Sequence, residues 1–199
     1  MKYLKMLGLA AVAAMALMAI GAGSASATTF ETNGVALSST VTIVATIEPG
    51  SSALLRDSAG TTADTCTESE VNGTTTSTSG ATITGPVATL SFGKCSHTTK
   101  VLANGKLHIS WISGTTDGTV TSSGAEVTVV STAFGVSATC KTGEGTHIGT
   151  LTGATNQTSN SSDTATMDIN GKISCGILGT STWTGAYTVT SPTDLGVIN

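Results

Sequence analysis

The sequence predicts an all-β fold, an antiparallel β-sandwich or barrel-like meander of about 10 short strands. Three observations predict it. Apolar residues alternate with polar ones along most of the chain, turn signals containing glycine separate the alternating runs, and four cysteines supply an even number for two disulfides. Together they indicate strands that reverse often and are joined by covalent links.

The alternation has the two-residue period of a β-strand, in which successive side chains point to opposite faces of a sheet. Leu107, Ile109 and Trp111 share one face, whereas Lys106 and His108 point the other way. Beyond residue 27 no window shows an apolar 3.6-residue period long enough for a helix. The alternating runs are Val41–Ile47, Ala88–Phe92, Leu107–Trp111, Ala125–Val129, Ala165–Ile169 and Trp183–Val189.

Turn signals lie between these runs. Asn104-Gly105 and Asn170-Gly171 favour two-residue type I′ hairpin turns, because asparagine and glycine best tolerate the positive φ that both central positions require. Further reversals are predicted at Ser79-Gly80, Asp117-Gly118 and Ser123-Gly124.

The N-terminus has the pattern of a secretory signal peptide. Lys2 and Lys5 precede an apolar stretch that is shorter than the roughly 20 residues of a membrane-spanning helix. It ends in Ala25-Ser26-Ala27, which fits the small-residue site of a signal peptidase, and no stop-transfer segment follows. We therefore expect residues 1–27 to be a signal peptide and residues 28–199 to form a single all-β domain.

The charge of the chain excludes two classes of partner. Cleavage after Ala27 removes two of the eight basic residues and none of the twelve acidic ones, so the formal charge changes from −4 to −6. The remaining Lys and Arg residues are not clustered. An acidic chain without a basic patch gives no footprint for nucleic acid or for anionic lipid, and we expect no stable membrane insertion after cleavage.

Cys66, Cys95, Cys140 and Cys175 are expected to form two disulfides, as is usual for an even number of cysteines in an exported chain. Three pairings are open. Cys66 with Cys95 and Cys140 with Cys175 is preferred, because neighbouring strands of a meander lie side by side. Each link would stabilise the fold by about 3 to 4 kcal/mol at most. A zinc site is disfavoured, since no C-x-x-C pair occurs.

The residues of nucleophilic catalysis show no recognisable arrangement. The histidines after the leader are His97, His108 and His147, no G-x-S-x-G motif occurs, and a triad would need Asp117 or Asp168 to be brought in by the fold. In the segment 142–149 the third glycine lies one residue too late for a dinucleotide-binding loop, and the segment joins β-strands instead of opening a helix, so we expect a turn. The sequence predicts no enzyme, no catalytic residue and no cofactor.

Acidic side chains suggest no metal site and no glycosidase. Glu68 and Glu70 lie two residues apart, which places both on one face of a strand and not on opposite sides of a sugar. Calcium would need more oxygen ligands than Asp117, or the loop with Asn156, Asn160 and Asp163, offers in a row. The polar tract Thr155–Ser162 within this loop predicts mobility.

Aromatic residues are too few for a sugar-stacking strip. Most of them lie on the apolar side of an alternating strand, where packing in the core is the expected role. The aromatic residues beyond the leader are Phe30, Phe92, Trp111, Phe134, Trp183 and Tyr187.

One resemblance adds to this interpretation. It is carried by Cys66–Ser69, Ala88–Phe92 before Cys95, Gly105–Ile109, Val120–Val129, Met167–Asn170 and Trp183–Thr190. In these segments and their order the chain resembles a large group of small exported all-β proteins of unassigned function, associated with actinobacteria. The resemblance implies fold and export, and no active site. The ending Asp194–Val197 departs from the aromatic tail of the group, so the resemblance supports no edge strand there.

Three functional hypotheses follow. The first is a secreted or cell-envelope, non-enzymatic protein with a structural or surface-interaction role, whose partner is unknown, with self-association or a surface glycan as candidates. The second is an extracellular β-domain that binds a small molecule or glycan, and the third is a secreted hydrolase. A cavity with a few polar groups would favour the second hypothesis, and a long exposed edge strand would favour assembly.

Overall fold

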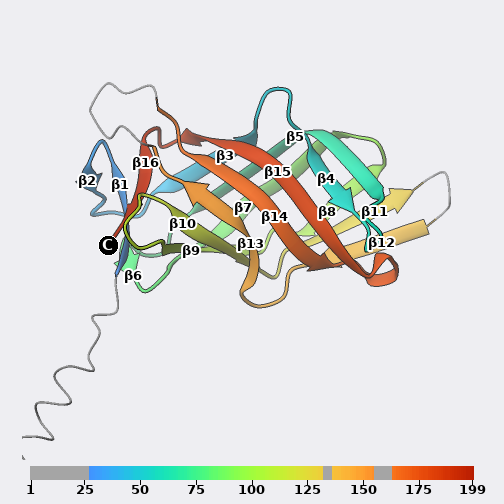
Figure 1. The fold of residues 1–199 in the computed structure, drawn as a ribbon. Coiled ribbons are helices and arrows are strands. Elements are labelled where there is room, and N and C mark those ends of the chain that lie inside the picture. Colours follow the sequence, from blue (N-terminus) through green and yellow to red (C-terminus); the bar gives the residue numbers. More distant parts are fainter. Residues whose placement is uncertain (1–26, 132–135, 155–162) are drawn as a thin grey trace, which may run out of the picture.

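A computed structural model describes residues 27–131, 136–154 and 163–199 of the chain (Figure 1). The described residues form strands and one short 3₁₀ turn, Gly176–Leu178, and they contain no helix with the length and hydropathy that a membrane span requires. Residues 1–26 of the expected leader and the tract Thr155–Ser162 lie outside them. The strands are β1 (Thr28–Thr32), β2 (Val35–Ala36), β3 (Thr42–Ile47), β4 (Ala53–Arg56), β5 (Thr62–Thr74), β6 (Ser79–Gly80), β7 (Ile83–Cys95), β8 (Thr98–Ala103), β9 (Lys106–Trp111), β10 (Gly118–Ser123), β11 (Glu126–Ser131), β12 (Val136–Lys141), β13 (Thr146–Thr152), β14 (Thr166–Ser174), β15 (Thr180–Ser191) and β16 (Leu195–Ile198).

The main sheet closes on itself as an antiparallel barrel with eight strand positions. β5, β7, β9, β10, β13, β14 and β15 pair in that order, and β3 and β4 share the remaining position between β15 and β5. β3 pairs with the stretch Glu70–Thr74 of β5, and β4 pairs with Thr62–Cys66 of the same strand. The predicted all-β fold is confirmed, in its barrel form.

Three further strands extend one end of the barrel. β8, β11 and β12 adjoin β9, β10 and β13 along the chain, and β11 pairs with both β8 and β12. Both disulfides lie near this end of the barrel. They join the cysteine pairs that the sequence favoured. Cys66 and Cys95 are direct partners across β5 and β7, whereas Cys140 of β12 is joined to Cys175 just after β14.

A small sheet of β16, β1, β2 and β6 covers the opposite end of the barrel (Figure 1). Phe30 of β1 and its partner Val197 of β16 are fully buried in the barrel core. The Thr28 hydroxyl accepts a hydrogen bond from the Trp111 amide and donates one to the Ala81 carbonyl. The C-terminal segment, for which the resemblance gave no support, is therefore an edge strand of this small sheet, hereafter the plug sheet.

Both predicted type I′ hairpin turns were wrong. Asn170-Gly171 lies inside β14, where the small glycine lets the strand approach Ile148; a Cβ at Gly171 would lie 2.8 Å from the Ile148 Cα. Asn104-Gly105 joins β8 to β9, which do not pair with each other. The Asn104 side chain instead bonds to the backbone of β7, through Leu90 N–H and the Ala88 carbonyl.

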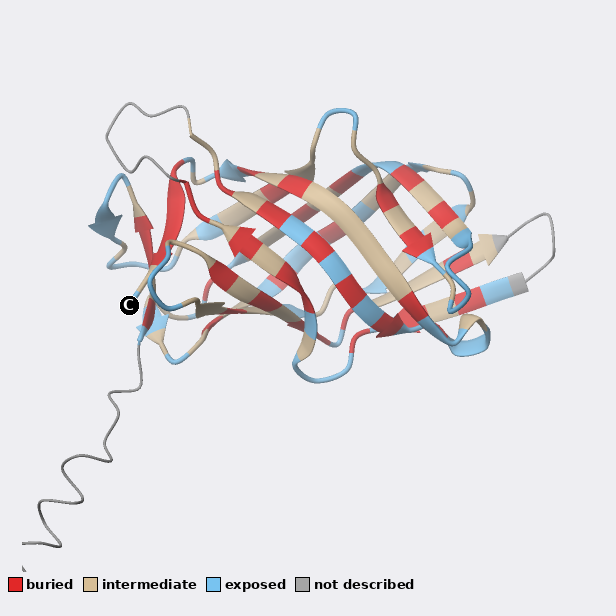
Figure 2. Cartoon of the chain, viewed as in Figure 1, coloured by how far each residue is buried: buried red, intermediate tan, exposed pale blue. Residues whose placement is uncertain are grey.

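The alternating pattern places aliphatic side chains inside the barrel, as the banded colouring along the strands in Figure 2 shows. A series of hydrogen-bonded polar groups lies within this interior. The Ser69 hydroxyl donates to the Ser91 carbonyl, so the fully buried Tyr187 hydroxyl, 2.9 Å from Ser69 Oγ, is the donor of that second bond. Burial raises the pKa of Tyr187 to about 12, against an opposing effect of the bond to Ser69.

Tyr187 provides a direct test of the barrel interior, because it is the only tyrosine of a chain that begins at Thr28. Its folded pKa is raised above the ordinary value of 10.0, so the stability that depends on the neutral phenol is present below pH 10 and is lost as the pH rises through about 12. We expect tyrosinate absorbance of the native protein to titrate near the higher value and that of the urea-unfolded protein near the ordinary one. Equal titration midpoints would contradict a buried phenol.

Candidate functional site

A cavity lies inside the barrel at the disulfide end, hereafter the outer chamber. About 540 Å³ of empty space lies in and in front of it, a figure that includes open solvent. Side chains of the ring strands β4, β5, β7, β14 and β15 and of the three further strands β8, β11 and β12 line it. The lining residues are Ala53, Leu54, Leu55, Asp64, Cys66, Leu90, Phe92, Thr99, Ala125, Val127, Val129, Cys140, Lys141, Thr142, Ile173 and Trp183.

The lining is almost wholly apolar. Leu55, Val129 and Ile173 pack with Cys140 and Cys175 in one buried cluster, so one disulfide forms part of the wall. Cys66 of the other disulfide lines the chamber as well. A cavity with mostly apolar walls suits an apolar molecule, because apolar surface leaves water when it is covered.

Trp183 of β15 brings an unpaired polar group to this lining. Its Nε1 atom is buried and has no hydrogen-bond partner among the residues that the structure describes. The ring of Trp183 contacts Phe92 edge to face, with centroids 5.8 Å apart. The other tryptophan after the leader, Trp111, donates its Nε1–H to the Thr115 carbonyl at 2.7 Å. The indole donor of Trp183 is thus a buried polar group that a bound molecule could satisfy.

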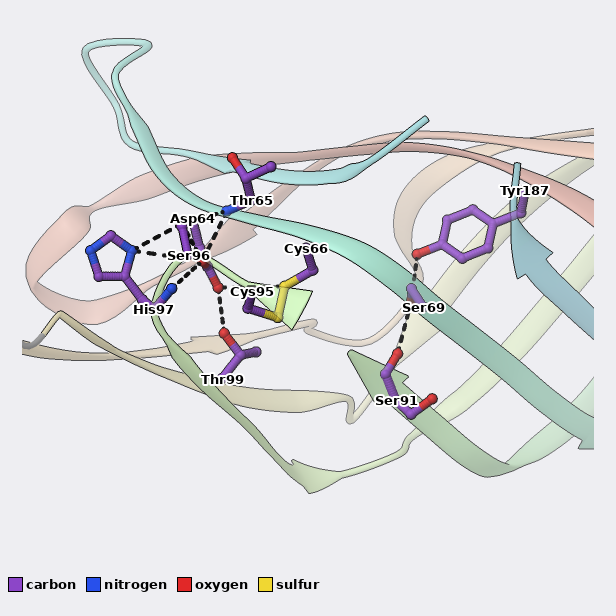
Figure 3. Close-up of a disulfide and its surroundings, with 10 residues drawn as sticks. All are labelled: Asp64, Thr65, Cys66, Ser69, Ser91, Cys95, Ser96, His97, Thr99 and Tyr187. Carbon is purple, nitrogen blue, oxygen red and sulfur yellow. Dashed lines mark hydrogen bonds and ion pairs between the residues drawn. A yellow bond between two sulfur atoms is a disulfide. The ribbon is translucent and has the colours of Figure 1, made fainter. Parts of the chain in front are cut away.

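Asp64 of β5 holds the wall of the chamber where β7 turns into β8 (Figure 3). Its carboxylate oxygen Oδ1 accepts hydrogen bonds from the amides of Thr65 and His97 and from the Ser96 hydroxyl, at 2.8 to 3.0 Å. Oδ2 accepts a bond from the Thr99 hydroxyl. Asp64 is 3% exposed, and these four donors replace the water that its burial removes.

The structure brings His97 close to a serine and an aspartate, but not as a catalytic triad. His97 Nδ1 lies 3.2 Å from Ser96 Oγ and 3.7 Å from Asp64 Oδ1. Because the Ser96 hydroxyl donates directly to Asp64, the imidazole does not stand between nucleophile and acid as a general base must.

The other residues considered for catalysis lie apart from this group. His108 is held between the hydroxyls of Thr84 and Ser123. His147 is exposed on β13. Asp168 is exposed on β14, and Asp117 accepts a bond from the Gly153 amide. The fold therefore supplies neither of the two aspartates to a histidine in the manner that a triad would need.

Asp64, Cys66 and Cys95 are close enough together to suggest a metal site, with ligand atoms within 4.8 Å of one another. The two sulfur atoms are joined in a disulfide, whereas a cysteine ligand must be a thiolate. The cluster therefore does not fit a metal in the oxidised protein.

Of the acidic candidates, Glu68 is exposed and pairs with Lys94 at 2.6 Å. This hydrogen bond raises the pKa of Lys94. Asn156 and Asn160 of the calcium hypothesis lie outside the described residues, as does the aromatic Phe134. Phe30 and Tyr187 are buried in the core, and Phe92, Trp111 and Trp183 pack against it, which is the role expected for them.

Comparison with family models, curated proteins and solved structures finds no match to this chain. The resemblance to exported actinobacterial proteins therefore stays a prediction. The function of the site is therefore argued from its geometry alone. Sequence analysis missed Asp64 and the unpaired indole of Trp183, although Asp64 lies two residues before Cys66 and thus shares its inward face.

Asp64 gives the second test. Asp64→Asn replaces an acceptor-only carboxylate by an amide whose NH₂ group faces donors, so we expect a loss of about 2 to 3 kcal/mol in the free energy of unfolding. The measurement is urea unfolding of the oxidised protein. Asp168→Asn, at an exposed position of β14, is the matched control and should change stability by less than about 0.5 kcal/mol. Equal unfolding midpoints of the two variants would show that the carboxylate does not hold the wall.

Proposed function

We propose that this protein is an exported, non-enzymatic binding protein that holds a small apolar molecule inside its barrel. The outer chamber carries the proposal. It combines an apolar wall with one unpaired donor, the features by which small-molecule pockets are recognised. An eight-stranded barrel is also the size that can hold one small ligand.

The rival hypothesis of a structural or surface-interaction role has less support. Closure of the barrel pairs the ring strands on both sides and leaves β8, six residues long, as an open edge of the main sheet, which is a short site for assembly through strand pairing. The large apolar side chains exposed among the described residues are Val35, Leu102 and Ile177, on three different elements. They give little continuous apolar surface for a partner or a second copy.

Export is supported by the leader pattern of residues 1–27 and by the two disulfides, which persist in oxidising compartments. β1 begins at Thr28, directly after the proposed cleavage site, and its first residue is already buried. Cleavage after Ala27 would thus remove the leader and leave the plug sheet complete.

Processing and export are tested on material collected from the culture medium and the cell envelope of an expressing bacterium. We expect N-terminal sequencing to begin at Thr28, and non-reducing peptide mapping to recover the pairs Cys66–Cys95 and Cys140–Cys175. Retention of the whole protein in the cytoplasm with residues 1–27 attached would overturn the proposed export.

Binding is tested with N-phenylnaphthylamine, an apolar probe whose fluorescence rises when it leaves water. We expect saturable binding by the oxidised protein. Val127→Trp should weaken it at least about tenfold, because the indole would occupy the outer chamber that Val127 lines. Val130→Trp, the same substitution at the opposite register of β11, should leave it unchanged.

Near-ultraviolet circular dichroism should show that both variants are folded. The proposal fails if the folded native protein does not bind the probe, or if Val127→Trp and Val130→Trp bind it equally.

A further inference from the structure

Four side chains with metal-ligating atoms gather where β5 meets the connection from β7 to β8 (Figure 3). They belong to Asp64, Cys66, Cys95 and His97. Cys66 and Cys95 are direct partners across the two strands. Asp64 lies two residues before Cys66, and His97 lies two residues after Cys95. The contact between the two segments continues past the cysteines, because the His97 amide donates to Asp64 Oδ1 at 3.0 Å. The antiparallel chains thus bring two thiol positions, a carboxylate and an imidazole together.

Three of these residues already have the spacing of zinc ligands. The two sulfur atoms and a carboxylate oxygen of Asp64 lie within 4.8 Å of one another. In a tetrahedral site with Zn–S bonds of about 2.3 Å and Zn–O bonds of about 2.0 Å, a sulfur and an oxygen ligand are about 3.5 Å apart. Cys66 Sγ and Asp64 Oδ2 are 3.6 Å apart. What prevents metal binding is the disulfide, which once opened would let the sulfur atoms separate.

Asp64 is held in the way that metal-binding carboxylates usually are. Its Oδ1 accepts three hydrogen bonds, whereas Oδ2 accepts one, from the Thr99 hydroxyl. The donors to Oδ1 are the Thr65 and His97 amides and the Ser96 hydroxyl. Oδ2, the oxygen beside Cys66, therefore keeps a lone pair for a metal ion. Hydrogen bonds to a ligating carboxylate fix its orientation, so this ligand is in place before any ion arrives.

The charge of the group favours a divalent cation once the cysteines are thiolates. Two thiolates and the Asp64 carboxylate would place three negative charges within 4.8 Å of one another. A divalent ion neutralises two of them, so the reduced cysteines and the ion stabilise each other. Thiolate and imidazole ligands select Zn²⁺, whereas Mg²⁺ and Ca²⁺ prefer oxygen ligands.

Of the two disulfides, Cys66–Cys95 is the one that a reductant can reach. Cys140 and Cys175 are both buried, at 4% and 0% exposed. Cys66 is buried as well, whereas Cys95 is partly exposed. A dithiol can attack Cys95 Sγ and form a mixed disulfide, with Cys66 leaving as a thiolate. The second thiol of the reductant then closes on the first and releases Cys95, so the reductant ends as a disulfide and both cysteines are reduced.

From these observations we propose that reduction of Cys66–Cys95 by a dithiol converts this part of the wall into a zinc site. Its ligands are the two thiolates, Asp64 Oδ2 and the His97 imidazole, and binding of Zn²⁺ releases both thiol protons. His97 Nδ1 is 3.7 Å from Asp64 Oδ1 and the side chain is 24% exposed, so the ring has room to turn toward the ion. Four protein ligands leave no open position, as in structural zinc sites. The ion would link β5 to β7 in place of the disulfide.

The first experiment compares metal binding by the oxidised and the reduced protein. Dithiothreitol, a dithiol, is removed under argon before Co²⁺ or Zn²⁺ is added, and alkylation with iodoacetamide followed by peptide mapping identifies the free thiols. We expect a thiolate-to-Co²⁺ charge-transfer band and the visible bands of a tetrahedral site only after reduction. Zn²⁺ should displace Co²⁺, protect Cys66 and Cys95 from alkylation, and release about two protons in calorimetry with buffers of different ionisation enthalpy.

The second experiment assigns the ligands. Cys66→Ser together with Cys95→Ser should abolish the charge-transfer band. His97→Ala should weaken Zn²⁺ binding by the reduced protein at least about tenfold, because even a residue that only supports a metal ligand contributes that much. His147→Ala, at an exposed histidine of β13, is the matched control and should bind Zn²⁺ like the unchanged protein.

The proposed site is overturned if the oxidised protein binds Co²⁺ as well as the reduced protein does, if no thiolate band forms, or if His97→Ala and His147→Ala have equal affinity. Loss of the near-ultraviolet circular dichroism on reduction in the presence of Zn²⁺ would also overturn it, because an unfolded chain does not hold these ligands in the wall. The inference is independent of the proposed binding function, whose probe experiment uses the oxidised protein.

Discussion

The structure depends on one constraint, the closure of the main sheet between β15 and β5. β3 and β4 together complete this last position, each along half of its length. Once the ring of backbone hydrogen bonds is closed, every strand has a fixed inner and outer face. The interior is then defined for the whole chain, and the aliphatic side chains of distant segments meet in one core.

Closure also explains why small cavities remain in the interior. A ring of eight strands has a fixed diameter, and large side chains are needed to fill its interior. Here the inward residues are mostly valine, isoleucine, leucine and alanine, and the large rings of Phe30 and Tyr187 are exceptions. Phe30 is placed at the plugged end. The remaining space is divided into cavities whose walls are apolar because the inward positions are apolar.

The disulfide end needs reinforcement of another kind. Beyond the closed ring, β8, β11 and β12 have fewer neighbours; the pairing of β12 with β14 consists of Lys141 opposite Ser174. Cys140–Cys175 supplements this pairing, and Cys66–Cys95 fixes the end of β7 to β5. Asp64 then positions the turn into β8 through four hydrogen bonds. Covalent links and a buried carboxylate thus keep an open chamber in shape where the sheet alone would be weakly paired.

Much of this architecture was predictable from local patterns. The two-residue period determined the strands and their inward residues, and the nearness of neighbouring strands in a meander favoured the disulfide pairs that the structure contains. The predicted hairpin turns at Asn104-Gly105 and Asn170-Gly171 were wrong, because contacts with distant residues decide the conformation there. The Asn104 side chain bonds to β7, and Gly171 makes room for Ile148. The sequence by itself determined an all-β, cysteine-linked domain, since both properties depend on residue type and spacing. Only the tertiary structure decided that the sheet closes, that four hydrogen bonds hold Asp64, and that Trp183 keeps an unpaired donor beside a cavity, because these depend on contacts between residues far apart in the chain.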